Sequence, residues 1–202
     1  MDRLIEGYRR FRETTWPQRR ALFEQLVADG QSPRTMVIAC SDSRVDPTMV
    51  FDVKPGELFI VRNVANLVPP YAPDAAYHGT SAALEFAVRG LEVQDIIVLG
   101  HAMCGGIHAL LHNESGVGTD FVGGWMRMAA PARARVLACT PVEAAQQACE
   151  YESVKLSLEN LTTFPWVADR VRDGKLRLHG AFFDIRTGIL ERLGADGSFA
   201  PA

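Results

Sequence analysis

The sequence predicts an α/β fold with a mainly parallel central sheet of about five strands, one antiparallel edge and helices on its flanks. Short apolar runs alternate along the chain with stretches whose apolar residues recur every three or four positions. The first pattern indicates buried strands, and the second indicates helices. Strands that alternate with helices are typical of a parallel sheet covered on both faces.

The predicted strands are short apolar runs. Three are expected at 35–40, 57–62 and 95–100, and a fourth at 175–183. A turn at 186–188 then leads into a short antiparallel strand, which forms the edge of the sheet.

Helical spacing predicts the helices that connect and follow these strands. Asp46 before Pro47 indicates a further helix start, because aspartate caps helices and proline suits the first turn. The longer helical patterns cover 81–90, 105–112, 122–137 and 142–161.

Two more helices precede the first strand. The first carries Leu4, Ile5 and Tyr8 at helical spacing, and the second begins at Pro17 and ends near Gly30. Their apolar faces must be buried, either on their own domain or on a partner subunit.

The chain is expected to be a single domain over 1–202, because no linker, repeat or low-complexity tract divides it. Within it, residues 1–28 form an N-terminal helical arm and residues 31–190 form the α/β core.

The composition excludes several classes of protein. The net charge of -3 gives no basic field for nucleic acid. No apolar run is long enough to span a membrane, and the N-terminal residues lack the apolar stretch of a secretory signal. We therefore expect a cytoplasmic protein. Its four cysteines are then better explained by metal binding, catalysis or burial than by disulfides.

Two motifs stand where predicted strands end. A-C-S-D-S-R covers 39–44, and G-H-A-M-C-G-G covers 100–106. Ligands bind beyond the carboxyl ends of parallel strands, so Cys40, His101 and Cys104 are expected to meet there if the two strands are neighbours. Thiolates and imidazole suit zinc, and three protein ligands leave a fourth position open, as in catalytic zinc sites.

Asp42 is the obvious candidate for a fourth protein ligand. Arg44 competes for it, because the guanidinium fork matches a carboxylate. We predict that the two form a pair that leaves the fourth zinc position to water. Gly105 and Gly106 allow a tight turn, and the helix that follows should favour the thiolate of Cys104.

The motifs together resemble those of the β-carbonic anhydrases. C-S-D-S-R-V at 40–45, P-G-E-L-F-I-V-R-N-V-A-N at 55–66 and the motif at 100–106 carry the resemblance, which runs from about residue 31 to the C-terminal strands. It implies one Zn²⁺ per chain on Cys40, His101 and Cys104. It also implies reversible hydration of CO2 to bicarbonate and a proton by zinc-bound hydroxide, with Asp42 and Arg44 beside the metal.

The resemblance also implies a substrate pocket of the plant type. Gln31 and Phe59 match its glutamine and one of its aromatic residues, and Phe86 stands where the plant type has a tyrosine. Gln31 and the backbone N–H near Gly105 are expected to bind an oxygen of CO2 or bicarbonate. Phe59 and Phe86 would form an apolar wall.

Two positions depart from patterns known in the family. Gly90 stands where plant enzymes carry a histidine proposed to shuttle protons, so the shuttle is unassigned. Val37 replaces a tryptophan that forms an inhibitory bicarbonate site in other members, which favours the open site. Because two thiolates cancel the charge of zinc, the pKa of the water bound to it should lie above that at a three-histidine site. We therefore expect activity to rise as the pH becomes alkaline.

The family assembles as dimers that exchange N-terminal helices and share active sites at the interface, so residues 1–28 are expected to bind a second copy. Dimers can associate further, into a tetramer or a larger assembly. Three alternatives remain. The same zinc site could hydrolyse COS or CS2. A closed site, with Asp42 on zinc, would suit a non-catalytic bicarbonate-sensing module. Least supported is a redox pair of Cys40 and Cys104, because the chain has no C-x-x-C motif.

Overall fold

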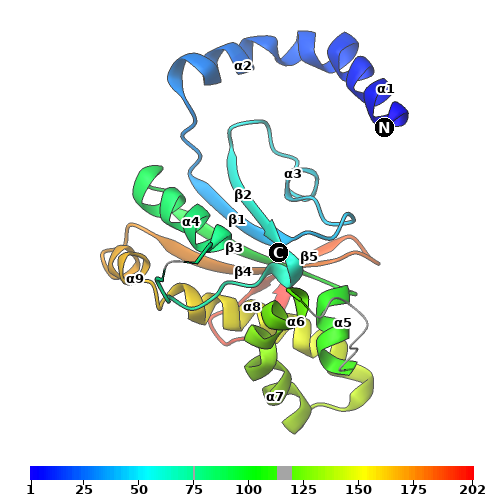
Figure 1. Ribbon diagram of the computed structural model, residues 1–202, viewed down its shortest axis with the longest axis vertical. Helices are drawn as coiled ribbons and strands as arrows, with labels where there is room; N and C mark the ends of the chain where they lie inside the picture. The colour runs from blue at the N-terminus through cyan, green and yellow to red at the C-terminus, as the bar shows by residue number, and fades with distance from the viewer. Residues whose placement is uncertain (75, 113–119) are drawn as a thin grey trace.

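The computed structural model describes residues 1–74, 76–112 and 120–202. Within them lies a six-stranded sheet in the order β2-β1-β3-β4-β5-β6. The first four strands of that order are parallel, and the last two are antiparallel additions at one edge (Figure 1). This confirms the predicted fold class. The strands are β1 Thr35–Cys40, β2 Leu58–Asn63, β3 Asp95–His101, β4 Arg177–Asp184, β5 Ile189–Leu193 and β6 Phe199–Pro201.

The first and third strands of the chain are neighbours, as the predicted site requires. β1 pairs with β3 in parallel, with Ala39 opposite Leu99. From Met36 to Cys40 every residue of β1 is buried, because helices or loops cover both faces of this central strand. A strand that is buried on both faces typically consists of an unbroken run of apolar residues.

Helices α4 Gly79–Glu85, α8 Ala145–Leu161 and α9 Pro165–Arg172 cover one face of the sheet. Their apolar side chains form a core with alternate residues of β1 and β3, including Ile38 and Val98. The short helix α3 Pro47–Val50 lies against the opposite face, and Asp46 caps it by accepting a hydrogen bond from the Thr48 N–H. The predicted cap is therefore present.

A second group of helices packs around the end of β1. α5 Gly105–His112, α6 Val122–Met126 and α7 Ala130–Cys139 form an apolar cluster with the start of α8, and this cluster includes Cys40 and Cys104. The pattern predicted as one helix over 122–137 is thus divided in two. A 3-10 turn at Arg127–Ala129 separates α6 from α7, whose first turn carries Pro131.

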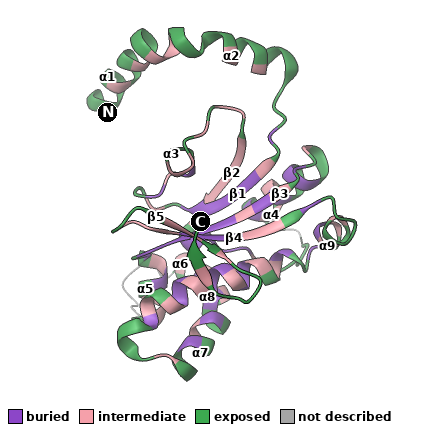
Figure 2. Ribbon diagram, turned by 180° about the vertical axis from the view of Figure 1, so that it is seen from behind, coloured by how far each residue is buried: buried purple, intermediate pink, exposed green. Residues whose placement is uncertain are grey.

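The N-terminal arm is one continuous helical run instead of two separate helices. α1 Asp2–Arg10 passes through a π-helical turn, Phe11–Thr15, into α2 Trp16–Asp29. The arm extends away from the sheet (Figure 1) and is exposed along most of its length (Figure 2). None of its residues is buried. α9 and β6 were not predicted, since both are short and carry weak patterns.

Candidate metal centre

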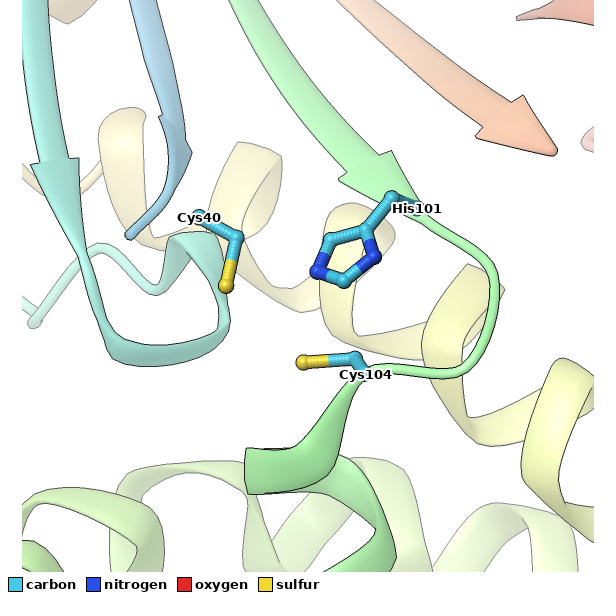
Figure 3. A group of neighbouring side chains, drawn as sticks. All are labelled: Cys40, His101 and Cys104. Atoms are coloured by element: carbon cyan, nitrogen blue, oxygen red, sulfur yellow. The ribbon is translucent and has the colours of Figure 1, made fainter. Parts of the chain in front are cut away.

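Cys40, His101 and Cys104 come together at the carboxyl edge of the sheet. Cys40 ends β1, His101 ends β3, and Cys104 lies immediately before α5. Their ligand atoms all lie within 4.8 Å of one another. Figure 3 shows the two sulfurs and the imidazole pointing toward a common centre. The structure therefore brings the three predicted ligands to one point, because two neighbouring parallel strands end there.

The imidazole of His101 is oriented as a metal ligand. Its Nδ1 lies 2.9 Å from the carbonyl oxygen of Ala102, which can only accept, so Nδ1 carries the proton. Nε2 is left with a lone pair, is buried, and has no hydrogen-bond partner among the described residues. An unpaired buried nitrogen next to two sulfurs is the donor set that a borderline-soft cation such as Zn²⁺ prefers.

The two neighbouring thiols shift each other's pKa in opposite directions. A hydrogen bond from Cys104, assisted by His101, lowers the pKa of Cys40 to about 4 even though burial opposes ionisation. The same hydrogen bond, together with burial, raises the pKa of Cys104. The N–H groups of Ile107 and Gly106 at the start of α5 act in the opposite direction and lower the pKa of Cys104, as expected from a helix start.

Arg44 binds Asp42 through both carboxylate oxygens. Its Nε and its backbone N–H donate to Oδ1, each at 2.9 Å, and Nη2 donates to Oδ2 at 2.7 Å. These hydrogen bonds hold the pKa of Asp42 well below its ordinary value. Among the described residues, Asp42 is not a member of the group that could hold a metal. The predicted pair of Asp42 and Arg44 is therefore present, and the carboxylate of Asp42 faces the guanidinium of Arg44.

The turn between His101 and Cys104 is tightly constrained. Met103 has a φ of 59°, in the left-handed region, and its carbonyl accepts a hydrogen bond from Arg44 Nη2 at 3.0 Å. A Cβ at Gly106 would lie 3.0 Å from Val64 Cγ1, so glycine permits close packing there. A Cβ at Gly105 would meet no atom within 4 Å, so this position is open on its side-chain side.

Three predicted pocket residues lie away from this chain's own metal centre. Phe59 stands opposite Met36 in the sheet, four residues before Cys40, which is roughly 13 Å along the strand. Phe86 packs on Phe59, with ring centroids 5.7 Å apart, and Gln31 lies in the link before β1. Phe59 and Phe86 therefore lie toward the N-terminal ends of the strands, whereas the candidate metal ligands lie at the C-terminal ends.

Sequence reasoning missed the residues that hold the ligand loops. Arg62 donates from Nε to the carbonyl of Cys40 at 2.8 Å and from Nη2 to the carbonyls of Asp42 and Val45. Glu150 on α8 accepts a hydrogen bond from the N–H of Cys104. A cation at the end of a predicted apolar strand was a usable signal for Arg62. Glu150 carried no comparable signal.

A hollow of about 680 Å³ lies beside the end of β2 and helices α4 and α6. It is lined mainly by apolar and aromatic side chains, including Trp125 and Tyr77, and contains none of the predicted site residues. No helix in the described part of the chain has the length and apolar character to cross a bilayer.

Comparisons with known proteins agree with this geometry. Residues 35–190 match the protein family described as "Carbonic anhydrase". The chain is 37% identical to Beta carbonic anhydrase 3 of Arabidopsis thaliana, across 100% of this chain and 80% of that protein. It is 41% identical to Beta carbonic anhydrase 5, chloroplastic, of the same plant, across 84% of this chain but only 57% of that longer relative.

Solved structures give the same result. The β-carbonic anhydrase CcaA superposes with a TM-score of 0.93 at 38% identity, covering 100% of this chain and 92% of CcaA. One of two tetrameric β-carbonic anhydrases from Sordaria macrospora superposes with a TM-score of 0.83 at 28% identity, covering 96% of both chains. The chain belongs to the β-carbonic anhydrase family.

Proposed function

We propose that this chain is a zinc enzyme that reversibly hydrates CO2 to bicarbonate and a proton, with one zinc ion per chain on Cys40, His101 and Cys104. The observation that carries the proposal is His101 Nε2, which is buried without a partner among the described residues and faces two sulfurs. Zinc bound there would supply the Lewis acidity that makes water nucleophilic, at a higher pH than at a three-histidine site because two thiolates offset the charge of the metal.

Asp42 would orient the attacking water. A carboxylate has about four lone-pair sites, and Arg44 occupies two on Oδ1 and one on Oδ2. One site on Oδ2 remains to accept a hydrogen bond. Because its pKa is held low by Arg44, Asp42 stays ionised and accepts without donating. This supports a catalytic, open site over a non-catalytic module in which Asp42 binds the metal.

The substrate would be held by groups from two subunits. Gly105 follows Cys104 and is exposed, and we propose that its N–H donates to a substrate oxygen. Phe59 lies roughly 13 Å along the sheet from the same chain's centre, and Phe86 packs on Phe59. We propose that these two residues, with Gln31, line the centre of a partner subunit.

Self-association as a homodimer follows from this division of the pocket. The helical arm has no buried residue in its own chain, and the Sordaria macrospora relatives are tetrameric. We propose that the arms are exchanged between two copies and that dimers can associate further. The cytoplasmic location expected from the sequence stays a prediction, which fractionation of the source cells would check.

The test combines metal analysis with stopped-flow CO2 hydration. Wild-type protein should carry one zinc per chain and hydrate CO2, whereas Cys104→Ala should lose stoichiometric zinc and activity. Assays with COS and CS2 on the same preparation distinguish the hydrolase alternative. Zinc-loaded wild-type protein that leaves CO2 unchanged would overturn the proposed reaction.

A further inference from the structure

Two side chains of α8 hold the main chain of Cys104. Glu150 Oε1 accepts a hydrogen bond from the Cys104 N–H at 2.9 Å, and Gln146 Nε2 donates to the Cys104 carbonyl at 3.2 Å. Gln146 Nε2 also donates to Glu150 Oε1 at 2.6 Å. Residues four apart share one face of a helix. Together they close a ring of hydrogen bonds around Cys104.

Burying these polar side chains costs free energy of folding, so packing alone does not explain why they are there. Glu150 is 2% exposed, and a buried carboxylate is tolerated only when hydrogen bonds replace water. Gln146 Oε1 is buried and has no hydrogen-bond partner in the described part of the chain, a loss of about 1–3 kcal/mol. The amide cannot turn over, because the Cys104 carbonyl and Glu150 Oε1 are both acceptors and require its nitrogen.

The same helix also fixes the strand that carries His101. A Cβ at Gly100 would lie 2.6 Å from Val154 Cγ2, so α8 approaches β3 closely one residue before His101. α8 therefore contacts the ligand segment at two points, Gly100 and Cys104. The four-residue segment 101–104 is held at both ends by one rigid element.

We propose that Glu150 and Gln146 are positioning residues that fix the Cys104 main chain so that its sulfur faces Cys40 and His101, and that they thereby slow release of the metal. This rests on the proposed zinc site. A ligand whose backbone is already fixed loses little freedom when a metal binds. Groups that orient metal ligands in this way typically affect metal affinity about 10- to 100-fold.

The test measures zinc transfer from zinc-loaded protein to excess 4-(2-pyridylazo)resorcinol. Glu150→Ala should release zinc about 10- to 100-fold faster than wild type, and Gln146→Ala should also release it faster. Glu150→Gln should stay near the wild-type rate, because an amide oxygen can accept both hydrogen bonds. Glu152→Ala is the matched control on α8, since Glu152 pairs with Arg135 and Lys155 and should not affect release.

A spectroscopic measurement separates positioning from general weakening of the fold. In cobalt-substituted protein, the thiolate-to-cobalt absorption should shift in Gln146→Ala and not in Glu152→Ala. Wild-type release rates in both alanine variants would overturn the proposal, as would Glu150→Gln releasing zinc as fast as Glu150→Ala. If Glu150→Ala does not fold, Gln146→Ala carries the test. A wild-type protein that binds no zinc would refute the proposed function itself.

Discussion

Arg44 joins the two loops that carry the proposed metal ligands. Its Nη2 donates to Asp42 Oδ2 at 2.7 Å and to the Met103 carbonyl at 3.0 Å. One guanidinium thus connects the segment after Cys40 to the turn between His101 and Cys104. It restrains the carboxylate that would otherwise be free to approach the proposed metal.

Replacing Arg44 should keep zinc but remove most activity. In Arg44→Ala, Asp42 loses its bidentate partner, and its carboxylate can bind zinc at the fourth coordination position in place of water. We expect kcat/KM for CO2 hydration to fall about 10- to 100-fold, with one zinc per chain retained. Stopped-flow assays with parallel metal analysis check this. Arg44→Lys should remain impaired, because lysine lacks the fork, and full activity in Arg44→Ala would contradict the pairing role.

Gly100 should not tolerate a methyl group. Its Cβ would lie 2.6 Å from Val154 Cγ2, and valine cannot easily turn away because its χ1 is restricted. Gly100→Ala should lower the free energy of unfolding by about 1–3 kcal/mol. Urea denaturation would measure this loss.

A double-mutant cycle tests the cause. Gly100→Ala/Val154→Ala should lose less stability than the sum of the single variants, because the two methyl groups no longer collide. Gly105→Ala, where the added atom meets open space, is the control. Strict additivity of the two changes would show that the contact is not the reason.

Asp95 should contribute stability that disappears in acid. Although burial opposes ionisation, hydrogen bonds from Arg177 and His179 lower the pKa of Asp95 below its unfolded value of 3.8. The folded chain therefore binds fewer protons, and the contribution is complete above about pH 4 and is lost as pH falls through the folded pKa.

The measurement is urea unfolding of wild type and Asp95→Asn at several pH values. The stability difference between them should be largest near neutral pH and shrink below pH 4, because Asp95 then becomes protonated. Any loss of metal at low pH affects both proteins and cancels in this difference. Asp173→Asn removes a more exposed aspartate and should show a smaller difference. A difference that stays constant with pH would refute the role of Asp95.

The cysteines should differ in reactivity toward iodoacetamide. Cys139 is exposed, whereas Cys149 is completely buried, and burial raises the pKa of its thiol to about 11. At pH 8 the zinc-loaded protein should therefore take up one label per chain, at Cys139. Peptide mass spectrometry locates the label. The Cys139→Ser variant should stay unlabelled until it is denatured, and rapid labelling of Cys149 would contradict its placement.

The strand ends of this fold were predictable because the relevant signals are local. Apolar runs that stop at Cys40 and His101 define where β1 and β3 end, and parallel pairing then brings both residues to one edge. The bidentate contact between Asp42 and Arg44 was predictable for the same reason, since the two residues lie only two positions apart in the sequence.

The support of the site was not predictable, because it depends on contacts between distant segments. Glu150 lies 46 positions from Cys104, and nothing in its neighbourhood marks it as buried. Phe59 and Phe86 were correctly expected to lie together, but their distance from this chain's own metal ligands follows from sheet register. Register between distant strands is set by three-dimensional packing, which local patterns do not contain.

The exposed N-terminal helix has a consequence for how the protein assembles. Isolated helices gain little stability without burial of a face, and this segment buries no residue within its own chain. Its ellipticity should therefore depend on protein concentration and fall when subunits separate, while the sheet persists. Encounter between two chains would then be visible as a coil-to-helix transition, in addition to a change in mass.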